Sequence, residues 1–274
     1  MKPRSARRSP LAFFLLLLAL AAPIWLLSRF VGVIGALKVP VTDLLLAFTP
    51  LASACILIFR EEGAAGVLDL LKRSVDLPRL ARTPWILPVL FLAPGVYVLT
   101  YAVLHLAGHP GEPELHLLRL PILAAIMFVL AIGEEAGWTG YALDPLQARW
   151  GALGASVIIA VPWWAGHLPS ILQIGGTAAD ITWWIPGAVA LRILMVWLYN
   201  SSGGLLFSAV LFHTVLNVGR SASYPTVGSH YDPAYQAVAY VILSLVAATV
   251  VVVCGAKTLN GRRAPAGSRP GPAR

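Results

Sequence analysis

Charge is the scarcest feature of this sequence. Asp, Glu, Lys and Arg make up 12% of its 274 residues, whereas 58% are hydrophobic and the mean hydropathy is +0.78. A soluble domain carries about 25% charged residues, so this chain cannot cover a water-exposed surface in the usual way. The composition therefore excludes an ordinary soluble domain. It predicts an all-α fold, a polytopic membrane helical bundle of about eight transmembrane helices.

Cysteine and metal-binding motifs are also scarce. Cys55 and Cys254 are the only cysteines, and both lie inside apolar runs, which excludes a disulfide framework and a cysteine metal cluster. We interpret both as packing residues. The sequence has no H-E-x-x-H motif and no internal repeat.

The basic residues are concentrated beside apolar runs. The net charge is +8, and fourteen of the twenty Lys and Arg residues lie within 2–8, 60–82 and 257–274. This distribution is typical of the positive-inside pattern of membrane proteins and not of a nucleic-acid-binding surface. It predicts a multi-pass protein of the cell membrane with both termini in the cytoplasm, the lipid bilayer as a partner and no nucleic acid.

Eight apolar segments approach the ~20 residues that a helix needs to cross a bilayer. They cover residues 11–27, 41–59, 85–106, 120–143, 152–174, 183–199, 204–218 and 237–255. With the amino terminus in the cytoplasm, eight crossings return the carboxy terminus there and also keep 60–82 on that side.

Four regions follow from this division. Residues 1–119 hold the first spans and an amphipathic cytoplasmic segment at 67–79, and residues 120–220 hold the candidate site. Residues 221–260 form the last loop and span. Residues 261–274 are rich in Gly, Pro, Ala and Arg and are predicted to be disordered.

Two adjacent carboxylates, Glu134 and Glu135, follow the apolar run 120–132. One charged group near a helix centre costs roughly 2.5–3.5 kcal/mol to insert, and two neighbouring carboxylates also repel each other. The simplest alternative is that both sit at the end of the span and face water, but the chain stays apolar or small until Asp144. We therefore predict a functional site here, with Trp138 on the same helix face as Glu134.

The other spans contain few strongly polar side chains. Those that they do contain are His167, Arg192, His213 and Asn217. Counted from the predicted cytoplasmic ends, Glu134, His167 and His213 lie roughly 15–22 Å into the membrane, at 1.5 Å per helical residue. These depths allow them to meet in one layer between the cytoplasmic half and the middle of the bilayer.

The spacing of these residues suggests a hydrolytic site. Trp163 and His167 are four residues apart, as are His213 and Asn217, so each pair shares a helix face. An imidazole and an amide aimed at one point can stabilise an oxyanion. Glu134 with His167 can bind and deprotonate a water molecule. Together these are the parts of an amide hydrolase without a Ser or Cys nucleophile.

The pattern resembles the family of CAAX prenyl proteases and bacteriocin-processing enzymes, also called the CPBP or ABI family. Its three motifs, E-E-x-x-x-R, F-x-x-x-H and H-x-x-x-N, correspond here to Glu134-Glu135, Trp163-x-x-x-His167 and His213-x-x-x-Asn217. Residues 137–141 and 198–204 match the family context, and the resemblance covers about 120–220.

This resemblance implies an intramembrane endopeptidase that cleaves membrane-associated, lipidated or small peptide substrates on the cytoplasmic side. It implies that Glu134 and His167 activate water and that His213 and Asn217 hold the oxyanion, with Glu135 completing the catalytic set. Family members have also been described as metalloproteases, so zinc held by Glu134, His167 and His213 is an alternative. We favour a glutamate mechanism without metal or other cofactor, because Asn217 is a poor zinc ligand.

Two residues depart from the family pattern. Thr139 stands where the family usually has Arg, and Trp163 stands where it usually has Phe. Arg192, in the middle of the sixth predicted span, needs an anion, carbonyl groups or water as a partner. We expect either that it reaches backbone carbonyls, or that it faces the glutamates, keeps Glu135 ionised and supplies part of the charge that Thr139 lacks.

Two other functions remain open. The missing Arg at position 139 is compatible with a catalytically inactive family member that acts as a membrane scaffold or a bacteriocin self-immunity protein. The paired carboxylates are also compatible with a proton-coupled transporter, although no inverted repeat supports one.

Overall fold

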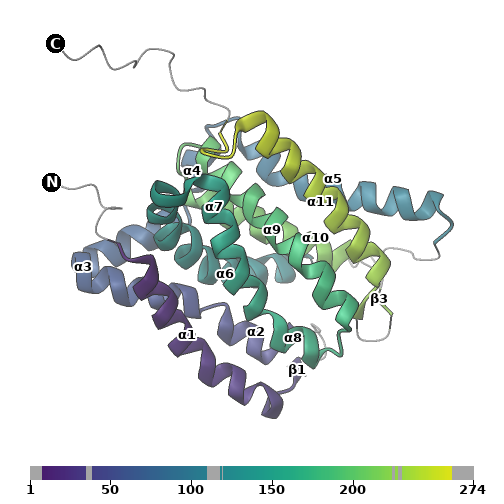
Figure 1. The fold of residues 1–274 in the computed structure, drawn as a ribbon, viewed down its shortest axis with the longest axis horizontal. Coiled ribbons are helices and arrows are strands. Elements are labelled where there is room, and N and C mark those ends of the chain that lie inside the picture. The colour runs from purple at the N-terminus through teal and green to yellow at the C-terminus, as the bar shows by residue number, and fades with distance from the viewer. Residues whose placement is uncertain are drawn as a thin grey trace.

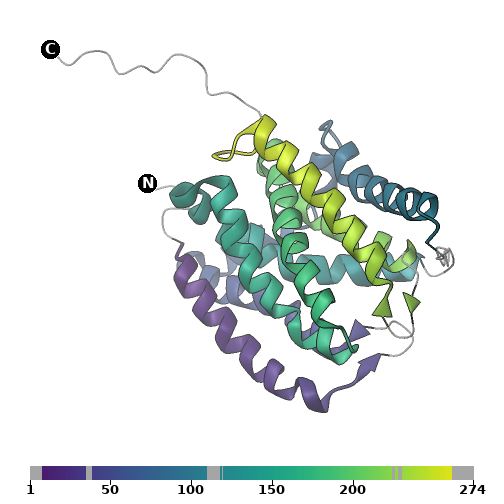
Figure 2. The same cartoon turned by 45° about the vertical axis from the view of Figure 1, so that its right-hand side comes forward.

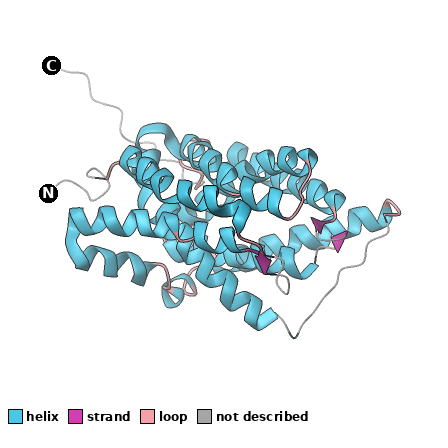
Figure 3. Ribbon diagram, turned by 90° about the horizontal axis from the view of Figure 1, so that it is seen from below, coloured by secondary structure: helices cyan, strands magenta, loops and turns pink. Residues whose placement is uncertain are grey.

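The predicted all-α membrane bundle is confirmed. The structure is a computed structural model that describes residues 8–34, 39–109, 118, 120–223, 226–227 and 230–260, and these residues are almost entirely helical (Figures 1 and 3). Two antiparallel pairs of two-residue strands connect helices: β1 (Val33–Ile34) with β2 (Val39–Pro40), and β3 (Thr226–Val227) with β4 (His230–Tyr231). The predicted disordered tail, 261–274, lies outside the described residues.

The helices follow the predicted apolar segments closely. In chain order they are α1 (Pro10–Leu27), η2 (Ser28–Phe30), α2 (Val41–Leu46), α3 (Thr49–Arg73), α4 (Leu77–Leu80), α5 (Ile86–Leu106), α6 (Leu120–Gly137), the π-helical turn η4 (Trp138–Ala142), α7 (Leu143–Gly166), α8 (Leu168–Gln173), α9 (Ala178–Ser201), α10 (Leu206–Ser223) and α11 (Pro233–Cys254).

Six helical stretches of the described chain have the length and hydropathy to cross a membrane. They are Pro10–Leu27, Val41–Arg73, Ile86–Leu106, Leu120–Gln173, Ala178–Ser201 and Pro233–Cys254. Leu120–Gln173 is 54 residues long and contains two of the predicted spans. Helix α10 corresponds to the predicted span 204–218 but is not among the six, so the number eight stays a prediction.

Glycines interrupt two of the long helices. Gly63 in α3 and Gly151 in α7 have φ values of 71° and 70°, a left-handed conformation that redirects the chain. The predicted amphipathic segment 67–79 begins after the first break, and its Leu70 is buried whereas Leu68 is 52% exposed. The predicted span 152–174 is also divided, because α7 ends at Gly166 and α8 begins with Pro169 in its first turn.

The two ends of the helical bundle can be identified by the contacts that lie there. At one end, which we call the terminal end, the Arg8 guanidinium donates to the Gly140 carbonyl at 2.8 Å and the Ala152 amide donates to the Lys257 carbonyl at 2.9 Å. At the opposite end, the far end, Gln173 donates to the Val31 carbonyl at 3.0 Å. The start of α1 and the end of α11 therefore lie at the same end of the bundle (Figure 1).

Helix α9 is the most enclosed helix of the described chain. It packs against α7 on one side and α11 on the other (Figure 2), and it also contacts α10. Its sequence is apolar around nearly the whole helix, as expected for a helix surrounded by others. Arg192, only 1% exposed, is nevertheless in the middle of it.

Candidate active site

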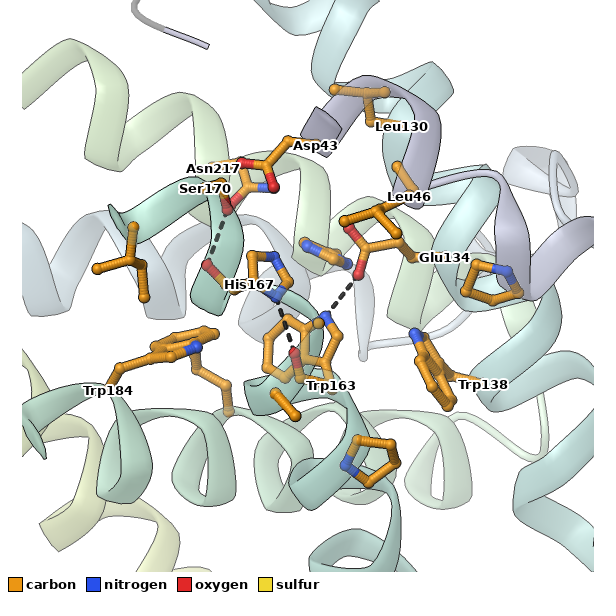
Figure 4. A pocket seen from close by; sticks show the side chains of 18 of the residues that line it. Asp43, Leu46, Leu130, Glu134, Trp138, Trp163, His167, Ser170, Trp184 and Asn217 are labelled. Atoms are coloured by element: carbon orange, nitrogen blue, oxygen red, sulfur yellow. Dashed lines mark hydrogen bonds between the residues drawn. The ribbon is translucent and has the colours of Figure 1, made fainter. Parts of the chain in front are cut away.

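A cavity of about 700 Å³ lies within the bundle. Its lining includes six of the residues singled out from the sequence: Glu134, Trp138, Trp163, His167, His213 and Asn217. They come from α6, η4, α7 and α10 and from the junction that follows α7, and Figure 4 shows Glu134, His167 and Asn217 around one space. The structure thus brings together residues that are up to 83 positions apart in the sequence.

Glu135 does not line this cavity but is held in the core beside it. Its side chain is fully buried and accepts from both terminal nitrogens of Arg192, at 3.0 and 2.8 Å. The Thr139 hydroxyl donates to Oε2 at 2.6 Å, and Nδ1 of His213 lies 3.0 Å from Oε1. A bidentate guanidinium and two further partners satisfy a carboxylate that would otherwise be costly to bury.

The α-helix explains why the two glutamates have different surroundings. Successive residues are rotated by roughly 100° around a helix with 3.6 residues per turn, so Glu134 and Glu135 cannot share a face. Glu135 faces α9 and α10, which supply Arg192 and His213. Glu134 faces the cavity and is only partly buried.

Trp163 connects Glu134 to the buried ion pair. Its indole N–H donates to Oε2 of Glu134 at 2.5 Å, and its ring face lies 4.0 Å from the Arg192 guanidinium carbon. The first contact is a hydrogen bond to a charged acceptor and the second is a cation–π contact. Phe, the usual family residue, would keep the ring face but could not donate the hydrogen bond.

His167 lies where α7 ends, not inside a continuous span as predicted. Its Nδ1 is 2.8 Å from the Trp163 carbonyl, which can only accept, so this contact assigns the proton to Nδ1. In the neutral ring Nε2 then carries the lone pair. The rings of Trp163 and Trp184 pack edge-on against the imidazole, with centroids 5.5 and 5.4 Å away, and fix its orientation.

His213 and Asn217 reach the cavity from successive turns of α10. His213 is 2% exposed, and its Nδ1 faces the Glu135 carboxylate, so this nitrogen carries a proton as well. Asn217 lines the cavity, as do Asp43 and Ser170 (Figure 4). The Tyr97 hydroxyl on α5 donates to the Leu216 carbonyl at 2.7 Å and anchors this part of α10.

Three charged residues of the cavity were missed from the sequence: Asp43, Asp180 and Arg220. Asp43 on α2 lies within reach of the Ser170 hydroxyl and close to His167, Glu134 and Arg220, and both Asp43 and Arg220 line the cavity. Asp43 is the only carboxylate in the predicted span 41–59, which was an available signal. Arg220 lies just beyond the predicted end of the span 204–218, in the last turn of α10.

Zinc has no evident site among these residues. Within the described part of the chain, no three His, Cys, Asp or Glu side chains lie close enough to hold a metal ion, and this includes the set Glu134, His167 and His213. Nδ1 of both histidines and one oxygen of Glu134 also have other partners. We therefore include no metal in the proposed reaction.

Part of the cavity lining is apolar and comes from α1 and α7. This part consists of Leu17, Leu18, Ala21, Val157 and Val161. Leu18 and Val161 are 55% and 59% exposed on the outer surface, where a membrane would place lipid. The cavity thus has a mostly apolar lining, in which the polar side chains of the candidate site are set.

The fold and this site define a polytopic membrane protein with a cavity between its helices that contains a few polar side chains. Residues 115–219 match the model of the type II CAAX prenyl endopeptidase Rce1-like family. CAAX prenyl protease 2 of Methanococcus maripaludis is 26% identical over 109 residues. That match spans 37% of this chain and 40% of the relative, and thus less than half of either protein.

Proposed function

We propose that the protein is an intramembrane endopeptidase that hydrolyses peptide bonds of membrane-associated or lipidated peptides. The observation that carries this proposal is the different environment of two adjacent carboxylates. Glu135 is neutralised by Arg192 in the core, while Glu134 faces a cavity that also contains His167, His213 and Asn217. Glu135 therefore serves as a structural carboxylate, whereas Glu134 is available for proton transfer.

In the proposed reaction Glu134 and Nε2 of His167 hold a water molecule. Glu134 takes a proton from the water as its oxygen attacks the carbonyl carbon of the peptide bond, and a tetrahedral oxyanion forms. Glu134 then gives the proton to the departing nitrogen, the C–N bond breaks, and a carboxylate and an amine are released. The enzyme returns to its starting protonation state without a covalent intermediate.

The oxyanion is stabilised by donors on α10. The Asn217 amide can donate in its neutral form. His213 uses Nδ1 for Glu135, so its Nε2 donates only when the ring is the imidazolium. The Glu135 carboxylate holds the His213 ring in place through Nδ1, which gives Glu135 an indirect role in the reaction.

Arg192, Thr139 and Trp163 act as positioning residues in this scheme. Arg192 and Thr139 hold Glu135 in place for His213, and Trp163 holds one oxygen of Glu134 so that the other can face the water. Trp138, whose indole lies beside Glu134 in Figure 4, forms a wall of the cavity.

The test is peptide cleavage by the purified protein in proteoliposomes, using membrane-anchored peptides and identifying the products by mass spectrometry. New amino and carboxy termini that appear only with the folded protein are expected. The absence of cleavage by folded protein over a broad peptide library would contradict the proposal and favour the non-catalytic scaffold or self-immunity protein. Proton-coupled uptake without cleavage would instead indicate a transporter.

A further inference from the structure

The charged side chains among the described residues that line the cavity are mostly acidic. They are three carboxylates and one guanidinium, those of Asp43, Glu134, Asp180 and Arg220, and with neutral histidines they carry a net charge of −2. The whole sequence has a net charge of +8, so the acidic cavity does not reflect the overall composition. Because most of the other lining residues are apolar, water screens these charges less than at an exposed surface. The cavity therefore favours a cationic ligand over an anionic one.

Two of the three carboxylates already have a role. Glu134 is the proposed general base, and Trp163 holds one of its oxygens. Asp180 is in the first turn of α9, where its Oδ2 accepts from the Thr177 backbone N–H at 2.7 Å and from the Thr177 hydroxyl at 2.8 Å. Both contacts belong to the cap that begins this helix. The remaining carboxylate, Asp43, has no part in the proposed reaction.

Asp43 is close to the reacting groups and is only partly buried. It lines the cavity near Glu134 and His167 and within reach of the Ser170 hydroxyl (Figure 4). That hydroxyl has one hydrogen, which it donates to the His167 carbonyl at 2.8 Å, so it does not donate to Asp43 in this arrangement. Arg220 is also near Asp43, but one guanidinium cannot balance three carboxylates. The Asp43 carboxylate can therefore accept from a further donor.

We propose that Asp43 binds a positively charged group of the substrate, and that the preferred peptide carries a Lys or Arg side chain beside the scissile bond. The position follows from the proximity of Asp43 to Glu134 and His167, which hold the attacking water in the proposed reaction. An ammonium or guanidinium group forms charge-assisted hydrogen bonds with a carboxylate, and the methylene groups of both side chains can contact the apolar lining. This inference rests on the proposed function for the identity of the ligand as a peptide.

Peptide binding to the protein in nanodiscs of zwitterionic phosphatidylcholine tests this preference without any cleavage measurement. The probes are fluorescein-labelled, acylated peptides that differ in one residue, which is Lys, norleucine or Glu and is moved along the peptide. At one stretch of the peptide, Lys should bind roughly 10-fold more tightly than norleucine, and Glu more weakly than norleucine. Equal binding of the Lys and norleucine peptides at every position, or no binding of any peptide, would overturn the inference. Cleavage alone decides the proposed function, so a Lys preference without cleavage would support the inference and contradict the proposed function.

Variants of Asp43 identify the residue that binds the cation. Asp43→Asn removes the charge but nearly keeps the size of the side chain, so it should reduce the preference for Lys to less than about threefold. Asp43→Glu retains the charge and should keep most of the preference. Asp69→Asn is the matched control, because it removes a carboxylate that pairs with Arg73 outside the cavity, and it should keep the full preference. An undiminished preference for Lys in Asp43→Asn, with folding verified by thermal unfolding, would overturn the inference.

Discussion

The buried Glu135 has its positively charged partner on a different helix. Thr139 replaces an arginine of the family pattern and keeps a hydrogen bond to Glu135, while the positive charge beside this carboxylate belongs to Arg192 on α9. Of the two expectations for Arg192, the structure agrees with the one in which it faces a glutamate. Whether its charge supports catalysis stays a prediction.

The buried pair predicts a strong coupling between Glu135 and Arg192. Arg192→Met should lower the free energy of unfolding by about 3–5 kcal/mol, because it leaves a buried carboxylate without its counter-charge. Adding Glu135→Gln to Arg192→Met should recover part of that loss. The measurement is unfolding of the purified variants in detergent, and simple addition of the two single losses would argue against the pair.

The hydrogen bond from Trp163 predicts an effect on turnover more than on binding. Trp163→Phe keeps the aromatic face but removes a donor to a charged acceptor, a bond worth about 1.5–3 kcal/mol, so kcat should fall roughly 10- to 100-fold. KM and thermal stability should change little. Trp184→Phe is the matched control, because its indole N–H has no partner among the described residues.

An unchanged kcat in Trp163→Phe would contradict the positioning role. It would mean that Trp163 is only a larger version of the Phe that the family usually has. A similar fall in both variants would point to general loosening of the cavity wall.

At the level of elements, the sequence predicted which segments form helices but not where they break. Apolar runs made the eight long helices evident, because hydrophobicity is a local property of the chain. The division into α2 and α3, the turn at Gly151 and the short α8 depend on contacts with distant segments. Asp43 was missed for this reason, because its place in the cavity depends on contacts with distant segments.

A close helix contact sets the position of Glu134. A Cβ added to Gly137 of α6 would be 2.4 Å from the Pro50 carbonyl oxygen of α3. Gly137→Ala should therefore push α6 away, lower the free energy of unfolding by about 1–3 kcal/mol and reduce kcat.

Gly95→Ala on α5 is the matched control, because a Cβ added there would meet no atom within 4 Å. It should leave activity unchanged and stability equal or slightly higher, since alanine favours the helix. If Gly137→Ala and Gly95→Ala have the same thermal stability and the same kcat, close packing at Gly137 does not position Glu134.

At the level of the whole molecule, three motifs predicted the residues of one cavity although they lie on separate helices. Their spacing along each helix was sufficient to identify shared faces. The sequence could not predict that Phe13 of α1 packs against Trp138 and Tyr141 of η4, because this contact joins segments that are far apart in the chain.

The glutamate mechanism predicts activity without zinc. An extensively chelated preparation should keep its rate of peptide cleavage and contain no stoichiometric zinc by elemental analysis. Loss of activity on chelation, with recovery on adding zinc, would reverse this assignment and require a different role for Glu134, His167 and His213.

The role of Glu134 as general base is the central claim, and kcat of Glu134→Gln tests it most directly. The amide oxygen can still accept from Trp163, but the side chain cannot take a proton, so kcat should fall by at least about 10²-fold while thermal stability is kept. Glu62→Gln, the same change at a glutamate paired with Arg8 at the terminal end, should keep nearly full activity. Retention of more than a few per cent of the wild-type kcat by folded Glu134→Gln would contradict the account.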